Sequence, residues 1–178
     1  MNYIIFDLEA TCEKDNKLFK NEIIEIGAVK LNDKLEVIGN FNEFIKPKLN
    51  PTLTNFCKEL TTIKQEDVDN ADIFPIVVER FKKWISIGKE DYILCSWGFY
   101  DKKQIGNDSM LYRLNDSWVK KHISLKHQFA EIKNVKPCGM MKALNILKLS
   151  LDGIHHRGID DAKNISKIFR SCFGQWKF

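Results

Sequence analysis

Two acidic side chains interrupt an apolar segment near the start of the chain. Residues 3–9 read YIIFDLE, so Asp7 and Glu9 follow aromatic and β-branched residues that are typical of a strand. Successive side chains of a strand alternate between its faces, which places both acids on one face, about 7 Å apart. A divalent cation would remove their repulsion and the cost of burying their charge. The alternative is an exposed strand end where both acids are simply solvated.

A third acid is predicted to point inward from the last helix. A helical pattern covers residues 159–173, and its apolar residues gather into one stripe. Asp161 falls within that stripe, whereas its neighbour Asp160 projects outside it and suits the first turn of a helix. The alternative for Asp161 is a carboxylate satisfied by backbone N–H groups of the first turn.

Asp101 and His156 complete the set of candidate catalytic residues. Asp101 follows a predicted strand and opens a helix, where an aspartate is often only a cap. His156 lies in a predicted loop five residues before Asp161, and a histidine of ordinary pKa accepts a proton at neutral pH. Most loop histidines are nevertheless inert. Four acids and one histidine are the inventory for two-metal phosphoryl chemistry, in which hard cations take oxygen ligands and a base prepares water.

The elements that must position these residues begin with three strands. Residues 3–9, 23–31 and 35–46 are predicted strands with short connections, which favours an antiparallel meander. The break at residues 32–34 (NDK) is typical of a hairpin, because Asn and Asp tolerate the left-handed backbone of a tight turn.

Helices dominate the rest of the sequence. Residues 52–60 predict a short helix, and a second helix begins at Pro75 and ends at Gly88. Residues 92–97 (YILCSW) predict a buried strand parallel to the first. Further helices are predicted from Asp101 and over residues 125–132, 139–149 and 159–173. This order indicates one α/β domain over residues 1–178.

Composition places the chain among globular proteins. Hydrophobic residues make up 44% of the 178 residues, enough for a full core, and the net charge of +4 permits an anionic partner without requiring one. The five cysteines lie far apart and form no metal-binding spacing, which indicates reduced thiols. With no predicted signal peptide or membrane span, we expect a soluble cytoplasmic protein.

Four segments together resemble the DEDDh family of 3′-to-5′ exonucleases. They read FDLEATC (6–12), NEIIEIGA (21–28), SWGFYDKKQ (96–104) and HHRGIDDAKNI (155–165). They are most similar to the exoribonuclease branch that contains the histone-mRNA exonuclease and bacterial sporulation-inhibitor relatives. A single Asp-x-Glu would be a weak signal, but three ordered motifs with His156 five residues before Asp161 are specific.

The resemblance implies an RNase H-like fold, a central mixed sheet flanked by helices. It implies that Asp7, Glu9, Asp101 and Asp161 hold two Mg²⁺ or Mn²⁺ ions and that His156 is the general base. The expected reaction releases nucleoside 5′-monophosphates from single-stranded RNA 3′ ends.

Other residues beside these motifs are candidates for substrate binding. Leu8, Ala10 and Thr11 flank the acids of the first strand and are expected to line the pocket for the terminal nucleotide. Trp97, Phe99 and Tyr100 offer faces on which a base can stack. The alternative for all six is ordinary packing.

Two other functions are compatible with the sequence. The metal chemistry does not distinguish sugars, so a DNA-directed exonuclease of proofreading type is one alternative. A non-catalytic nucleic-acid-binding or regulatory protein is the other, although such a protein is expected to lack at least one of the five catalytic residues.

Overall fold

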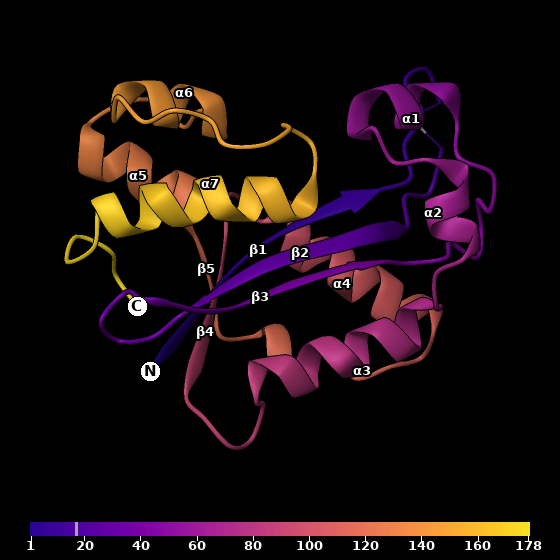
Figure 1. Cartoon of the computed structure of the whole chain (residues 1–178), viewed down its shortest axis with the longest axis horizontal. Coiled ribbons are helices and arrows are strands. Elements are labelled where there is room, and N and C mark those ends of the chain that lie inside the picture. Colours follow the sequence, from indigo (N-terminus) through magenta and orange to yellow (C-terminus); the bar gives the residue numbers. More distant parts are fainter. Residues whose placement is uncertain (17) are drawn as a thin grey trace.

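The computed structural model describes residues 1–16 and 18–178, which form a mixed sheet at the centre of the molecule (Figure 1). Its strand order is β3-β2-β1-β4-β5. β1 and β2 pair antiparallel, as do β2 and β3, whereas β4 runs parallel to β1 and β5 parallel to β4. The predicted meander and the predicted parallel strand are confirmed. The strands are β1 (Asn2–Ala10), β2 (Ile23–Leu31), β3 (Val37–Phe44), β4 (Tyr92–Ser96) and β5 (His122–Ser124).

Helices cover both faces of this sheet. Figure 1 shows α5, α6 and α7 on one face and α3 and α4 on the other, with α1 and α2 beyond the end of β1. The resulting layers make an α/β fold, as predicted. The helices are α1 (Asn55–Thr61), α2 (Gln65–Asp69), α3 (Phe74–Ile85), α4 (Tyr100–Leu111), α5 (Leu125–Lys133), α6 (Met140–Ile146) and α7 (Gly158–Ser171), with a 3₁₀ turn at Ser117–Val119.

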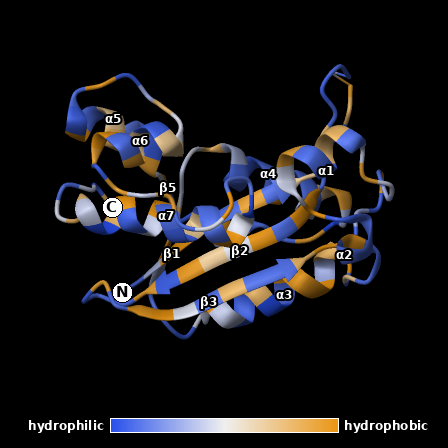
Figure 2. Ribbon diagram, turned by 45° about the horizontal axis from the view of Figure 1, so that its top comes forward, coloured by the Kyte–Doolittle hydropathy of each residue, from blue (hydrophilic) through white to orange (hydrophobic). Residues whose placement is uncertain are grey.

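The alternation of side chains along β1 divides the core into two parts. Tyr3 and Ile5 pack with apolar residues of α5, α6 and α7, whereas Ile4 and Phe6 pack with α3 on the opposite face. Figure 2 shows β1 and β2 mainly in the hydrophobic colours, whereas hydrophobic and hydrophilic residues alternate along the helices that cover them. Asp7 continues the face of Tyr3 and Ile5, so it points toward α7.

The hairpin between β2 and β3 differs from its prediction in one detail. The Asn32 side chain accepts hydrogen bonds from the backbone N–H groups of Lys34 and Glu36, both at 2.9 Å. The left-handed residue of this turn is Leu35, with φ 64°, and not an Asn or Asp. Because the turn uses residues 35 and 36, β3 begins at Val37, two residues later than predicted.

Three short elements are not predicted from the sequence, and several helix boundaries differ from their predictions. Helix α1 begins at Asn55 and not at residue 52, and α6 ends at Ile146 and not at residue 149. α2, the 3₁₀ turn and β5 each span five residues or fewer, too short to display a periodic pattern. Helix α3 ends at Ile85 because Ser86 adopts a left-handed conformation with φ 71°, so Gly88 lies beyond the helix. Among the described residues, no helix combines the length and apolar character needed to cross a bilayer.

Candidate metal and active site

The acids predicted on the first strand and the last helix come together. Carboxylate oxygens of Asp7, Glu9 and Asp161 all lie within 4.8 Å of one another. Glu9 and Asp161 are buried, with 7% and 5% of their surface exposed, and Asp7 is partly exposed. A β-bulge follows Glu9 in its pairing with β2, a distortion often found beside functional sites.

A close approach between β2 and α7 makes this convergence possible. A Cβ atom added to Gly27 of β2 would lie 2.0 Å from the carbonyl carbon of Gly158, the first residue of α7. Only glycine at position 27 therefore lets the start of α7 rest against the sheet. Asp161 is in the first turn of α7, so this contact brings its carboxylate to the acids of β1.

Asp101 joins the same cleft from the first turn of α4. It is 5% exposed, and its carboxylate accepts a hydrogen bond from the backbone N–H of Leu8 at 3.3 Å. Its oxygens are outside the 4.8 Å group formed by the other three acids, although all four line one cleft of about 430 Å³. Strand β1 thus connects Asp101 to the acid pair through its own backbone.

Crowding of these carboxylates opposes their ionisation. Burial raises the pKa of Asp7 well above its usual value, and Asp101, Glu9 and Asp161 raise it further. Burial, followed by Asp161 and Glu25, raises the pKa of Glu9 to about 8. Burial raises the pKa of Asp101 to about 6, although hydrogen bonds from Ser96 and Leu8 favour its charged form. A bound cation would relieve this repulsion, because its positive charge favours the ionised carboxylates.

The two adjacent histidines lie against Asp161. The His156 ring stacks on the His155 ring with 3.9 Å between centroids, and the backbone N–H of His156 donates to Asp161 at 3.0 Å. His156 has φ 65°, a strained conformation for a non-glycine residue and one that clusters at functional sites. Burial and the neighbouring His155 lower the pKa of His156, so its ring is neutral at pH 7 and able to accept a proton.

The helical wheel predicts that Asp161 points inward and that its neighbour Asp160 does not, and the structure agrees. Asp161 faces the cleft, whereas the Asp160 carboxylate accepts a hydrogen bond from the backbone N–H of Ile154 at 3.0 Å. Asp160 also pairs with Lys163 at 3.4 Å. It therefore ties the preceding loop to α7 and is not part of the acid cluster.

Three residues that lie beside the acid cluster are not predicted from the sequence. They are His155, Glu25 and Arg157. The His155 Nδ1 atom lies 3.1 and 2.9 Å from the two carboxylate oxygens of Asp161. Glu25 is fully buried directly across from Glu9, where it accepts hydrogen bonds from Arg157 at 3.2 Å and from the Gly158 N–H at 3.0 Å. The strand 23–31 is apolar except for Glu25 and Lys30, and this charge in an apolar strand was the available signal for Glu25.

Three of the six candidate substrate-binding residues line the catalytic cleft, and the other three do not. Leu8, Trp97 and Tyr100 line the cleft beside the acids. Ala10, Thr11 and Phe99 do not line it: Thr11 is 1% exposed and accepts a hydrogen bond from the Glu22 N–H at 2.9 Å, and Phe99 is 57% exposed beside the cleft. The cleft is also lined by Lys126, Gly139 and Met140, which lie outside the four segments that resemble the family.

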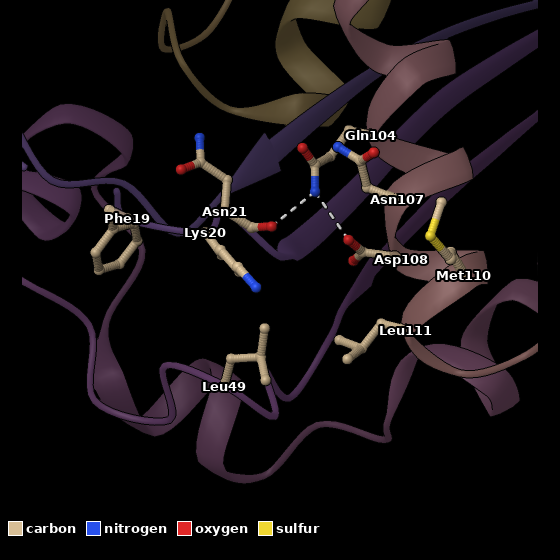
Figure 3. A pocket seen from close by; sticks show the side chains of 9 residues that line it. All are labelled: Phe19, Lys20, Asn21, Leu49, Gln104, Asn107, Asp108, Met110 and Leu111. Atoms are coloured by element: carbon tan, nitrogen blue, oxygen red, sulfur yellow. Dashed lines mark hydrogen bonds between the residues drawn. The ribbon is translucent and has the colours of Figure 1, made fainter. Parts of the chain in front are cut away.

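A second cleft, of about 580 Å³, lies further along α4 (Figure 3). Its lining contains none of the predicted catalytic residues. The side-chain amide of Asn21 donates to the Tyr100 hydroxyl at 3.1 Å, and this hydrogen bond stands between the two clefts. The Gln104 amide donates to the Asn21 carbonyl and to Asp108, both at 2.8 Å, so its hydrogens are occupied (Figure 3).

Comparison with known proteins assigns the chain to a family. It is 36% identical over 174 residues to 3′-5′ exoribonuclease 1 of Rattus norvegicus, covering 92% of this chain and 50% of the relative, and 35% identical to the Homo sapiens protein of the same name. The chain thus spans about half the length of the curated relatives it matches.

Solved structures agree with that assignment. The nuclease domain of 3′hExo, described as a DEDDh family member bound to rAMP, superposes with a TM-score of 0.92 at 32% identity, covering 99% of this chain and 94% of that one. A 3′-exonuclease solved with the histone mRNA stem-loop gives 0.91 at 31% identity, covering 96% and 63%. The RNase T exonuclease profile matches residues 4–169, so the chain belongs to this exonuclease family and has its RNase H-like fold.

Proposed function

We propose that this protein is a divalent-metal-dependent 3′-to-5′ exoribonuclease. The observation that carries the proposal is the convergence of Asp7, Glu9 and Asp161, whose oxygens lie within 4.8 Å of one another in a cleft that also contains Asp101 and His156. Relatives named 3′-5′ exoribonuclease 1 share this domain at 35–36% identity, which supports the choice of reaction.

The donor set fits hard divalent cations. Four carboxylates supply only oxygen ligands, the type that Mg²⁺ and Mn²⁺ prefer. The raised pKa values of Asp7, Glu9 and Asp101 are consistent with a cluster that lacks a compensating positive charge. Asp7, Glu9, Asp101 and Asp161 would hold two such ions. When bound, the ions lower the pKa of a water molecule and neutralise charge on the phosphate.

The protein groups around the acids move the proton and position the strand. A neutral His156 ring takes a proton from the attacking water, whose oxygen forms a bond to the last phosphorus of the RNA. The bond between that phosphorus and the 3′ oxygen of the preceding nucleotide breaks, and this oxygen takes up a proton. The products are a nucleoside 5′-monophosphate and an RNA shorter by one residue.

RNA is the proposed substrate because the relatives point to it. A similar structure is described with a histone mRNA stem-loop and another with rAMP. In this chain Leu8, Trp97 and Tyr100 line the cleft and would enclose the terminal nucleotide. All five cysteines are free thiols, which supports our proposal that the protein acts in the reducing cytoplasm. We also propose that residues 1–178 act as one exonuclease domain, built on a single five-stranded sheet.

The test compares matched single-stranded RNA and DNA, each labelled at the 5′ end, with Mg²⁺, with Mn²⁺ and with a chelator. We expect a ladder that shortens from the 3′ end on RNA and disappears when the chelator is added. A faster ladder on DNA would replace the proposal by a DNA-directed exonuclease, and the absence of hydrolysis on both would favour a binding protein.

A further inference from the structure

An exposed aromatic side chain stands beside the catalytic cleft. Phe99 is 57% exposed, and its chain neighbours Gly98 and Tyr100 both line the cleft. The Phe99 ring rests on the His127 ring with 5.0 Å between centroids and an interplanar angle of 26°. The His127 Nδ1 atom lies 2.6 Å from the Ser124 hydroxyl, which fixes the ring beneath Phe99. The two rings therefore form a supported flat surface that meets water.

A lysine adjoins both this surface and the catalytic cleft. Lys126 precedes His127 in the first turn of α5, and its backbone N–H donates to the carbonyl of Trp97 at 2.9 Å. Its side chain lines the cleft that contains the four carboxylates. Its ammonium group makes no hydrogen bond or ion pair with any of the described residues, so it is available to a ligand.

From this geometry we propose that the RNA strand leaves the catalytic cleft over Phe99, Lys126 and His127, which we call the exit platform. The base of the penultimate nucleotide stacks on Phe99, and Lys126 contacts the phosphate on its 5′ side. The proposal rests on the proposed exonuclease function and adds the path of the substrate. Proteins that bind single strands without preference for the base sequence combine aromatic faces, on which the bases stack, with cations that contact the phosphates.

The second cleft along α4 is the competing route. Its lining contains one cation, Lys20, together with the buried acid Asp108 (Figure 3). Asn21 of this lining donates a hydrogen bond to the hydroxyl of Tyr100, which lines the catalytic cleft. Asp108 offsets the charge of Lys20 in the second cleft, whereas the three residues of the exit platform include a lysine and no acid. The exit platform adjoins the catalytic cleft directly and presents an aromatic face already supported by His127.

Steady-state kinetics of Phe99→Ala test the stacking contact. The substrate is a single-stranded octaribonucleotide, and AMP serves as a competitive inhibitor that reports on the terminal-nucleotide site alone. We expect the KM of Phe99→Ala for the octamer to rise roughly 5- to 100-fold, the range for losing one stacked base, with a much smaller change in the Ki for AMP. Phe99→Trp restores a stacking face and is expected to return KM to near the wild-type value.

Met110→Ala is the matched control, because Met110 is 76% exposed and lines the second cleft. We expect its KM for the octamer to equal that of the wild type. A raised KM in Met110→Ala beside an unchanged KM in Phe99→Ala would overturn the proposal and place the strand in the second cleft.

Salt dependence tests the phosphate contact. Each phosphate neutralised on a single strand contributes about 0.7 to the slope of log affinity against log salt concentration, so Lys126→Met should lower that slope by about this amount. Lys133→Met, in the last turn of the same helix, is the control and should leave the slope unchanged. Equal slopes for wild type and Lys126→Met would contradict the contact.

The two proposals fail in different ways. If the exonuclease proposal is wrong, the wild-type protein hydrolyses no octamer. If only the exit platform is wrong, the wild type shortens the octamer and the Phe99 and Lys126 variants do so with unchanged KM and salt slope.

Discussion

The adjacent residues Asp160 and Asp161 have the same chemistry and different surroundings. Asp161 is buried among the acids, whereas Asp160 bonds to the Ile154 N–H and Lys163 outside the cluster. Asp161→Asn should be nearly inactive, because an amide offers a neutral oxygen where a cation requires a charged ligand. Asp160→Asn should keep most activity and lose at most about 0.3–2 kcal/mol of stability. Parallel rate and unfolding measurements check both; an active Asp161→Asn beside an inactive Asp160→Asn would refute the ligand assignment.

His156 has a role that differs from the ligands around it. Replacing it with Ala should lower turnover by roughly 10²–10⁴-fold, the usual cost of losing a general base, with little change in metal affinity. Turnover measured at saturating RNA, combined with a calorimetric Mn²⁺ titration, separates the two effects. Loss of a Mn²⁺ binding event in His156→Ala would show that His156 is a ligand and not a base.

At the scale of elements, the contact between β2 and α7 sets the geometry of the cleft. A Cβ atom at Gly27 would meet the Gly158 backbone at 2.0 Å, so Gly27→Ala must push the start of α7 away from the sheet. We expect a loss of about 1–3 kcal/mol or more in the free energy of unfolding, with loss of activity because Asp161 moves with the helix. Gly39→Ala in β3 is the control, since its Cβ would meet only the Trp84 side chain, at 3.4 Å.

Unfolding in denaturant and hydrolysis of RNA check this pair of variants. Equal stability and activity in Gly27→Ala and Gly39→Ala would mean that the approach of α7 to β2 does not control the site.

The same elements explain what the sequence reveals and what it hides. Period-two alternation predicts that Asp7 and Glu9 share a face of β1, and the helical wheel separates Asp161 from Asp160, because both rules depend only on local geometry. Tertiary contacts follow no such rule. The stacking of Phe99 on His127 joins residues 28 positions apart, and the approach of Gly27 to Gly158 joins residues 131 apart, so neither has a local signature.

At the scale of the whole molecule, the acid cluster links stability to pH and to metal. Without metal the pKa of Glu9 is about 8 in the folded protein, against an ordinary value of 4.5, so the fold retains a proton that the unfolded chain releases. The stability that this proton contributes is complete below pH 4.5 and is lost as the pH rises to about 8. Asp7, with its raised pKa, acts in the same direction.

Glu9→Gln should therefore be more stable than the wild type at pH 8 in a chelator, because glutamine carries no charge to bury. The difference should shrink as the pH falls toward 5. Thermal unfolding across this range, with and without Mn²⁺, measures it. A Glu9→Gln variant that is less stable than the wild type at pH 8 would show that the carboxylate has a structural role that outweighs its repulsion.

If the converging carboxylates form a divalent-cation site, a calorimetric titration with Mn²⁺ detects the bound ions and counts them. We predict that the wild-type protein binds two ions and that Asp161→Asn loses at least one of them, whereas Asp160→Asn binds as the wild type does. Identical Mn²⁺ isotherms for the wild type and Asp161→Asn, or no binding to the wild type at all, would contradict the account.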